Sequence, residues 1–336
     1  MRLFVTGANG FLGRAVVDAA LVAGHEVLAM VRDTNRWAGP TGPGVELVQG
    51  DLRDPASWRD RVTDVDVVVH LAATKAGDLH TQFAGTVVGT ERLLDVLDAT
   101  PPTRLVHIST FSVYDYEAAP AGSQLDERSP LEDEPATRDE YAQTKLVQER
   151  LVRERSAEAS WELVVLRPGA VWGPGELWDG GGLMGLGSAR TLVVAPNAAL
   201  KLTYVTNCAE AIVAAADAPA AAGATIDIVD DDPPSARQFA QALRQAGLPV
   251  RQAVAVPYGV MHGAATLLDR VNRRFVGGNA KLPGIIMPAK LAARAKPLTY
   301  PNARAKELLG WQPRLGLRAA IEACAEAERS TLGYRQ

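Results

Sequence analysis

The chain has 336 residues, of which 47% are hydrophobic and 22% charged, so it can form one large or two smaller globular domains. Its net charge of −4 and its lack of a long apolar run argue against nucleic acid, anionic lipid or a membrane as partners. Two cysteines, Cys208 and Cys324, provide neither a disulfide framework nor a metal site. The first residues lack the features of a signal peptide, so we expect a cytoplasmic protein without a bound metal.

Strand-like and helix-like segments alternate along the first half of the chain. Strands are expected at residues 2–6, 26–31, 45–49, 65–71, 104–109, 161–167 and 224–229, and helices at 11–23, 83–97, 139–155, 257–274 and 315–328. This alternation predicts an α/β fold with a Rossmann-type, doubly wound parallel sheet. Residues 172–187 are rich in Gly, Pro and Trp and are expected to form a loop near a cleft.

The change in composition after Pro168 predicts two domains. A dinucleotide-binding Rossmann domain is expected over residues 1–170 together with about 200–230. A smaller, mostly C-terminal substrate-binding domain is expected from 171–199 and 231–336.

Three glycines mark the turn between the first strand and the first helix. Their positions permit a tight turn, close approach of a pyrophosphate to the backbone, and close packing of helix on strand. The helix N-terminus adds N–H donors and a partial positive charge. The alternative is a glycine-rich turn that holds no ligand. The residues expected to contact a cofactor here are Gly7, Asn9, Gly10, Phe11, Leu12 and Gly13.

The end of the second strand indicates which dinucleotide is preferred. Val31 occupies the place where an acidic residue would bind the ribose hydroxyl, and Arg32 follows. A guanidinium pairs well with a 2′-phosphate, so NADP is the preferred cofactor and NAD the alternative. The competing interpretation is that Arg32 is an exposed loop residue and Asp33 binds the ribose.

Residues after the third and fourth strands are expected to line the rest of the cofactor site. Asp51 either accepts a hydrogen bond from the adenine amine or caps a helix around 55–61, and Leu52 follows it. Small residues end the fourth strand, as is needed where backbone lies against a cofactor. The residues in question are Leu71, Ala72 and Ala73.

Tyr141 and Lys145 stand four residues apart on a predicted helix, and therefore on one face. A nearby ammonium stabilises a phenolate and lowers the pKa of a phenol. Such a tyrosine can exchange a proton with a carbonyl or alcohol oxygen while hydride moves to or from nicotinamide. The hydroxyl residues after the fifth strand can hold the same substrate oxygen.

With these motifs in place, the chain resembles the extended short-chain dehydrogenase/reductase superfamily, the NAD(P)-dependent epimerase/dehydratase group, over nearly its whole length. The pattern is most similar to the 3β-hydroxysteroid dehydrogenase and dihydroflavonol reductase branch. The resemblance implies that Thr110 is the catalytic hydroxyl and Ser109 is structural. It also implies that the segment containing Pro168 and Val171 passes the nicotinamide.

Departures from the family pattern bear on the substrate. Phe111 and Ser112 replace the Asp-Glu pair of 4,6-dehydratases, and Leu202 replaces an arginine common in nucleotide-sugar enzymes. The residues expected to contact substrate are Lys75, Phe111, Ser112, Trp172 and Trp178. For Lys75 the alternative is an exposed loop lysine, and for the tryptophans it is core or lid packing.

These observations favour an NADP-dependent ketone reductase or alcohol dehydrogenase acting on a small organic substrate. The alternatives are an NAD-retaining nucleotide-sugar epimerase and a non-catalytic NADP-binding regulatory or scaffold protein. The family resemblance also implies a homodimer formed by two helices of each copy. The apolar residues expected to supply that surface are Val87, Val88, Leu94, Leu97, Leu146 and Leu151.

Overall fold

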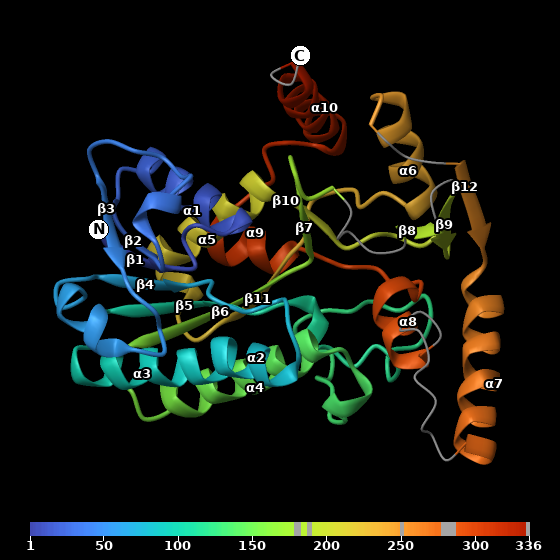
Figure 1. Cartoon of the computed structure of the whole chain (residues 1–336), viewed down its shortest axis with the longest axis horizontal. Coiled ribbons are helices and arrows are strands. Elements are labelled where there is room, and N and C mark those ends of the chain that lie inside the picture. The colour runs from blue at the N-terminus through green and yellow to red at the C-terminus, as the bar shows by residue number, and fades with distance from the viewer. Residues whose placement is uncertain (178–182, 187–189, 249–251, 277–286, 334–336) are drawn as a thin grey trace.

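A seven-stranded parallel β-sheet forms the centre of the fold (Figure 1). The computed structural model describes residues 1–177, 183–186, 190–248, 252–276 and 287–333. The strands lie in the order β11-β6-β5-β4-β1-β2-β3, and each neighbouring pair is parallel. Their bounds are β1 Arg2–Thr6, β2 Glu26–Val31, β3 Val45–Gln49, β4 Val67–His70, β5 Arg104–Ile108, β6 Glu162–Pro168 and β11 Thr225–Ile228. The predicted Rossmann-type sheet is therefore confirmed.

Helices cover both faces of this sheet (Figure 1). One face is covered by α1 Phe11–Val22, α5 Val205–Asp217 and α9 Ala303–Leu309. The other is covered by α2 Leu79–Phe83, α3 Gly89–Ala99 and α4 Glu140–Ser156. Because both faces are covered, β4 and β5 are buried at every residue, which explains their largely apolar sequences.

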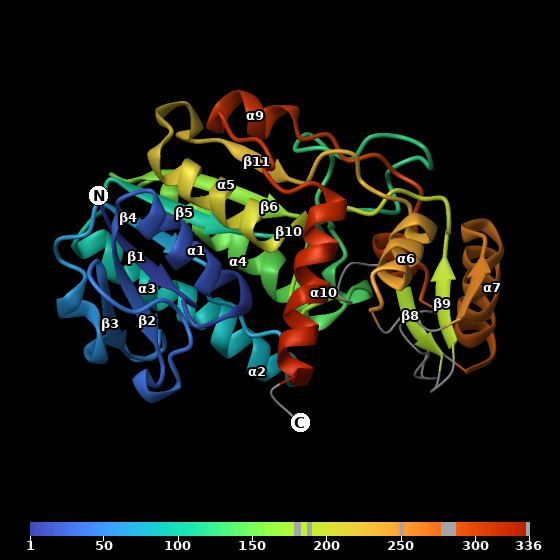
Figure 2. The ribbon, with the colours of Figure 1, turned by 90° about the horizontal axis from the view of Figure 1, so that it is seen from above.

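A second group of elements lies beyond one end of the main sheet (Figure 2). It contains a three-stranded sheet in the order β12-β9-β8 and three helices. The bounds are β8 Leu183–Leu186, β9 Arg190–Val194, β12 Gln252–Val256, α6 Ala236–Gln245, α7 Tyr258–Val276 and α8 Pro288–Ala295. A further parallel pair, β7 Ala170–Trp172 with β10 Leu202–Tyr204, and helix α10 Leu317–Gly333 complete the fold.

One local prediction was wrong, and the predicted bounds of one helix were too short. The loop expected over 172–187 contains β8, which pairs antiparallel with β9, a partner that local composition does not reveal. The helix expected over 83–97 begins earlier, at Leu79, and runs to Ala99. A π-helical turn, Ala84–Val88, interrupts its regular geometry, so the periodic pattern is displaced by one residue there.

Helix α9 lies in the region that the sequence assigned to the second domain. Its Ala305 and Leu309, with Trp311 just beyond, pack into the core between the main sheet and α5. The division of the chain into two domains remains a prediction. In that division α9 belongs with the first domain.

Candidate functional site

The turn between β1 and α1 is tightly packed. Gly7 has a φ of +70°, and a β-carbon on it would lie 3.0 Å from the backbone nitrogen of Ala72, beyond β4. A β-carbon on Gly13 would lie 2.2 Å from the carbonyl oxygen of Gly7. A larger residue at either position would force the turn, α1 or the end of β4 to move.

The N-terminus of α1 has the chemistry of an anion site. Its N-cap is Gly10, which has no side chain to accept hydrogen bonds from the first-turn N–H groups. Gly10 is exposed, whereas Phe11 and Leu12 are half-buried, and the Phe11 ring approaches the backbone of Gly173. An exposed, uncapped helix start fits the pyrophosphate of a dinucleotide.

Polar contacts hold the loop that follows β2. The Asn9 side chain donates to the carbonyl of Arg36 at 2.8 Å and accepts from the N–H of Ala38 at 3.1 Å. Asp33 accepts from a backbone N–H two residues further on, at 3.0 Å, and so caps a short 3-10 turn. Arg32 is exposed beside this loop. Asp33 thus has a local structural role, while Arg32 extends into solvent.

Asp51 closes a turn after β3. It accepts hydrogen bonds from the backbone N–H of Arg53 at 2.9 Å and from its guanidinium at 2.6 Å. The bond from Arg53 outweighs burial and, with the charges of Arg53 and Arg32, lowers the pKa of Asp51. Leu52 is buried beside it. Residues 55–61 form two 3-10 turns instead of a helix, and a contact between Asp51 and adenine stays a prediction.

The segment after β4 leads from the glycine turn to α4. Half-buried small or apolar residues come first, namely Leu71, Ala72 and Ala73. The N–H of Thr74 then donates to the hydroxyl of Thr86, in the π-helical turn, at 2.9 Å. The ammonium of Lys75 lies 5.9 Å from the centre of the Tyr141 ring. Lys75, predicted to contact substrate, is therefore a neighbour of the predicted proton donor.

Helix α4 begins at an Asp139 cap, which accepts from the N–H of Ala142 at 3.0 Å. Tyr141, in its first turn, is half-buried. Lys145, one turn later, is only 2% exposed. The Lys145 ammonium donates to the carbonyl of Ile108 at 2.7 Å and to the side-chain oxygen of Gln148. Burial lowers the pKa of Lys145 to about 7, the charge of Glu149 opposes this shift, and that of Lys75 adds to it.

Behind Lys145 lies a chain of buried polar side chains that the sequence did not reveal. Gln148 donates to the Thr90 hydroxyl at 2.7 Å, and Thr90 lies 2.8 Å from Nε2 of His70. Nδ1 of His70 lies 2.7 Å from the Thr6 hydroxyl on β1. Burial lowers the pKa of His70 to about 3, so the ring is neutral. The one sequence signal was the spacing of Lys145 and Gln148 on a single helix face.

The hydroxyl residues after β5 take two different roles. Ser109 is buried and donates to the carboxylate of Glu149. Thr110 is half-buried, accepts from the N–H of Ser112 at 3.2 Å and caps a 3-10 turn. Ser112 is half-buried as well, but Phe111 is 1% exposed and packs edge-on against two tyrosines. Phe111 therefore lies in the core, whereas Thr110 and Ser112 retain accessible surface.

A buried ionic network contacts the segment after β5 through Ser109 and Glu149. Arg167 donates to Glu149 at 2.5 Å and to the Tyr114 hydroxyl at 3.0 Å, and Tyr114 donates to Asp227 at 2.7 Å. Burial alone would raise the pKa of Glu149, but Arg167, Ser109 and Arg153 bring it down to about 2. Glu149, Arg153 and Asp227 were not singled out from the sequence, whereas Ser109 was expected to be structural.

The residues predicted to lie near the nicotinamide and the two tryptophans predicted to contact substrate lie in different environments. Pro168 is buried at the end of β6, and Val171 is half-buried in β7. Trp172 is 1% exposed and lies edge-on to two aromatic rings, which corresponds to core packing. Trp178 lies outside the described residues.

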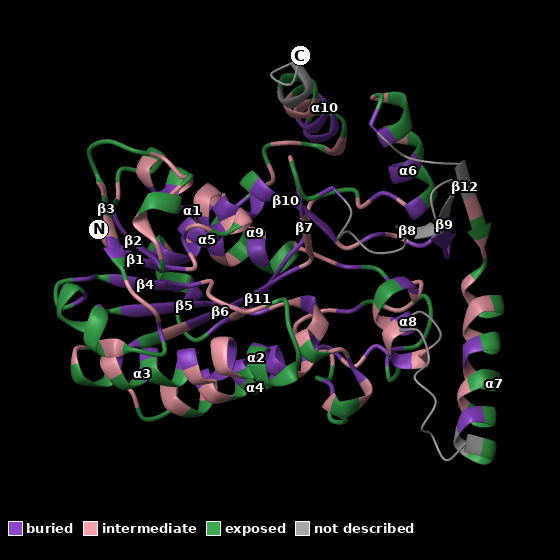
Figure 3. Ribbon diagram, viewed as in Figure 1, coloured by how far each residue is buried: buried purple, intermediate pink, exposed green. Residues whose placement is uncertain are grey.

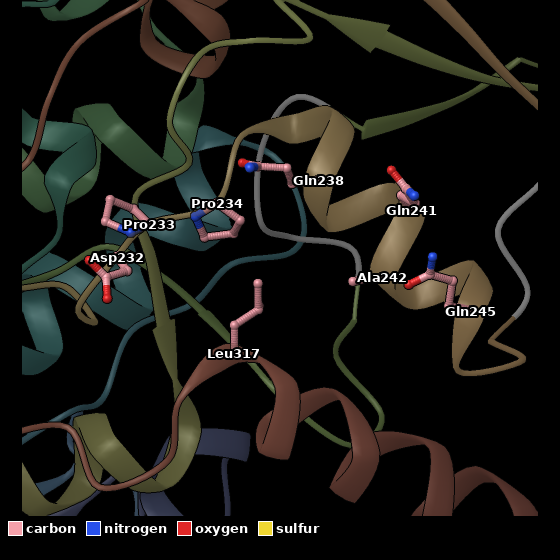
Figure 4. Close-up of a pocket in the computed structure, with 8 residues that line it drawn as sticks. All are labelled: Asp232, Pro233, Pro234, Gln238, Gln241, Ala242, Gln245 and Leu317. Atoms are coloured by element: carbon pink, nitrogen blue, oxygen red, sulfur yellow. The ribbon is translucent and has the colours of Figure 1, made fainter.

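A surface hollow occurs elsewhere, between α6 and the start of α10 (Figure 4). It contains no residue predicted to bind cofactor or substrate. Its lining residues are Asp232, Pro233, Pro234, Gln238, Gln241, Ala242, Gln245 and Leu317.

Comparisons with known proteins identify the family and the fold. Residues 3–229 match the NAD dependent epimerase/dehydratase family. A 2-alkyl-3-oxoalkanoate reductase of Stenotrophomonas maltophilia is 35% identical over 179 residues, 52% of each chain. The chain spans about half the length of this relative and of the next two curated relatives it matches.

Two further proteins are similar over nearly the whole chain. A 4-hydroxy-2-methyl-3-oxo-4-farnesyl-3,4-dihydroquinoline-1-oxide ketoreductase of Stigmatella aurantiaca is 27% identical over 331 residues, 97% of this chain and 96% of its own. A short-chain dehydrogenase/reductase superfamily protein from Agrobacterium tumefaciens, solved with bound NAD, has a TM-score of 0.73 and 22% identity. The match covers 100% of this chain and 99% of that one, which shows the shared fold.

Proposed function

Because this chain belongs to the NAD-dependent epimerase/dehydratase family of extended short-chain dehydrogenases/reductases, we propose that it is an NADP-dependent ketone reductase. The observation that carries the proposal is the placement of Tyr141 and Lys145 on α4, with Lys145 hydrogen-bonded to the end of β5 just before Thr110. This bond keeps the helix with the phenol beside the strand end with the hydroxyl.

The bound dinucleotide would supply or accept a hydride. Tyr141 would donate the proton to the carbonyl oxygen of the substrate, and Thr110 would hold that oxygen with a hydrogen bond. Lys145 would stabilise the phenolate that remains. Two of the three N–H donors of the ammonium are used by Ile108 and Gln148, which leaves one for the phenol or the ribose. Arg32, exposed beside the glycine turn, would pair with the 2′-phosphate.

We propose a ketone substrate attached to an apolar chain or ring. The Stenotrophomonas relative is named for a 2-alkyl-3-oxoalkanoate and the Stigmatella relative for a farnesyl-bearing ketone. A nucleotide-sugar epimerase is less well supported. Leu202, where those enzymes carry an arginine, is 2% exposed within β10. The neighbouring Lys201 is occupied by a hydrogen bond to the carbonyl of Ala293.

The test is NADPH oxidation by the purified protein with a panel of 2-alkyl-3-oxoalkanoates and cyclic ketones. UDP- and dTDP-sugars are assayed in parallel as substrates of the alternative function. Tyr141→Phe should lower turnover by at least about 100-fold, the scale of a lost general acid. Tyr258→Phe, which removes a hydroxyl from the distant helix α7, is the matched control. Ketone turnover that survives in Tyr141→Phe, or activity only with nucleotide sugars, would refute the proposal.

A further inference from the structure

Helix α7 gathers exposed apolar side chains. Of the eleven large hydrophobic side chains exposed in the described part of the chain, five lie on this helix. They are Val260 (64% exposed), Leu267 (62%), Leu268 (43%), Val271 (43%) and Phe275 (78%). A contiguous apolar surface of this kind generally marks a contact with another molecule.

The spacing of these residues aligns them along one stripe. Val260, Leu267, Val271 and Phe275 are separated by seven, four and four residues, which places them on one helix face over four turns. The opposite face packs on the protein through Ala265, in a core shared with α8 and β9. Figures 1 and 2 both place α7 at the outer edge of the molecule, and Figure 3 shows exposed residues along it.

Positive charge flanks this stripe. Arg270 and Arg274 are exposed, and each follows a stripe residue, Leu267 or Val271, by three positions, so both lie along one border of the stripe. Together α7 and α8 contain five Arg or Lys and a single Asp, so they carry +4 in a chain whose net charge is −4. The net charge of −4, which argued against a lipid partner, is a sum over the whole chain and does not reveal this local excess of positive charge.

We propose that α7 is an interfacial helix that docks the protein on an anionic lipid bilayer. The apolar stripe would enter the boundary between headgroups and acyl chains, while the two arginines would meet lipid phosphates. The apolar stripe with charge along its border suits adsorption in the membrane plane. No helix in the described part of the chain is long and apolar enough to cross a bilayer. A second copy is a poorer occupant, because its own α7 has three arginines and one aspartate and so offers little negative charge to Arg270 and Arg274. The inference does not depend on the proposed reductase activity.

Vesicle cosedimentation tests the proposal. The full chain is mixed with phosphatidylcholine vesicles prepared with and without the anionic lipid phosphatidylglycerol. Binding should require the anionic lipid and should weaken with added salt. Arg270→Glu/Arg274→Glu should weaken binding by more than roughly 25-fold, about fivefold for each lost positive charge, and the added negative charges should weaken it further. Leu267→Ser/Phe275→Ser should weaken binding by at least roughly tenfold through lost apolar burial.

Controls separate docking from misfolding and self-association. Val22→Ser removes an apolar residue on α1 that is 81% exposed, more than Leu267 or Phe275, and this variant should bind vesicles like the unchanged protein. All variants should keep the thermal unfolding midpoint, because the substituted side chains are exposed. Equal binding to both vesicle types, or binding unaffected by both double variants, would overturn the proposal. So would an oligomer in vesicle-free buffer that Leu267→Ser/Phe275→Ser dissociates, since it would identify a second copy as the occupant.

Discussion

The ammonium of Lys145 donates a hydrogen bond to the carbonyl oxygen of Ile108 at 2.7 Å. This bond joins the second turn of α4 to the last residue of β5, and its two residues are 37 positions apart in the sequence. Because Tyr141 precedes Lys145 by one turn and Thr110 follows Ile108 by two residues, one contact fixes the relative position of both. The predicted catalytic groups are thus held together by a lysine that is itself buried.

Gln148 should act as a positioning residue for Lys145. Its side-chain oxygen accepts from the ammonium and favours the charged form, so Gln148→Met should lower the pKa of Lys145 further. With less positive charge near Tyr141, the pH at which reduction loses rate should move upward. Rate–pH profiles of both proteins check this. Gln143→Met, on the same helix but bonded to the Arg138 carbonyl, should leave the profile in place.

Arg32 should discriminate between the two nicotinamide dinucleotides. Arg32→Ala should weaken NADPH binding by about 1.5–3 kcal/mol, the range for a charged hydrogen bond, and leave NADH binding almost unchanged. Titration calorimetry with both dinucleotides measures the difference. Arg36→Ala, another exposed arginine of the same loop, serves as a comparison. Equal affinity of the unmodified protein for NADPH and NADH would contradict the predicted preference.

Glu149 should contribute to stability in a pH-dependent way. It is 2% exposed and paired with Arg167, so Glu149→Gln should cost about 3–5 kcal/mol at pH 7. The pKa of Glu149 is depressed to about 2 in the folded chain, below the ordinary value of 4.5. Its stabilisation is therefore full above pH 4.5 and is lost as pH falls toward 2. Urea unfolding at pH 7, 5 and 3 should show the two proteins converging, while the exposed Glu158→Gln should match the unmodified protein throughout.

The dimer predicted from the family resemblance requires a revised surface. Leu94, Leu97 and Leu146 are buried within one chain and have no surface to offer a second copy. A groove between the π-helical turn and α4 remains, where Phe83 is 42% exposed and Val147 38% exposed. Its lining residues are Phe83, Val87, Val88, Glu91, Val147, Arg150, Leu151 and Glu154.

We expect this groove to pair with its copy around a two-fold axis. Light scattering should then give a dimer mass at micromolar concentration. Phe83→Asp/Val147→Asp should yield a monomer, whereas Val22→Asp, on α1, should remain dimeric. A monomeric unmodified protein would contradict the expectation.

The parts of the site that lie close together in the sequence were predictable. Gly7, Gly10 and Gly13 lie within one turn, and Tyr141 and Lys145 within one helix, so spacing alone brought each group together. The parallel arrangement of the sheet followed from the alternating elements, because parallel strands need crossover helices between them.

The parts built from distant segments were not predictable. His70, Thr90 and Gln148 come from three elements, and each alone resembles an ordinary buried polar residue. Phe111 and Trp172 were assigned to substrate because they lie near motifs. Their burial depends on aromatic partners up to 189 residues away, as in the contact of Phe111 with Tyr300, which periodicity does not show.

The π-helical turn Ala84–Val88 contains one more residue than a regular helix needs at that point. Within it, a β-carbon on Gly85 would lie 2.0 Å from the hydroxyl oxygen of Thr74, so the loop carrying Lys75 lies directly against this backbone. Deletion of Gly85 would let the helix wind regularly through this point and would leave Leu79–Phe83 and α3 facing nearly as they do now, because the wide turn absorbs the extra residue. A lineage that lost this single codon would keep its helix and its sheet, and the change would be confined to the backbone on which Thr74 and the Lys75 loop pack. Length variation at this one position is thus a route by which the fold can alter the support of the Lys75 loop without altering its core.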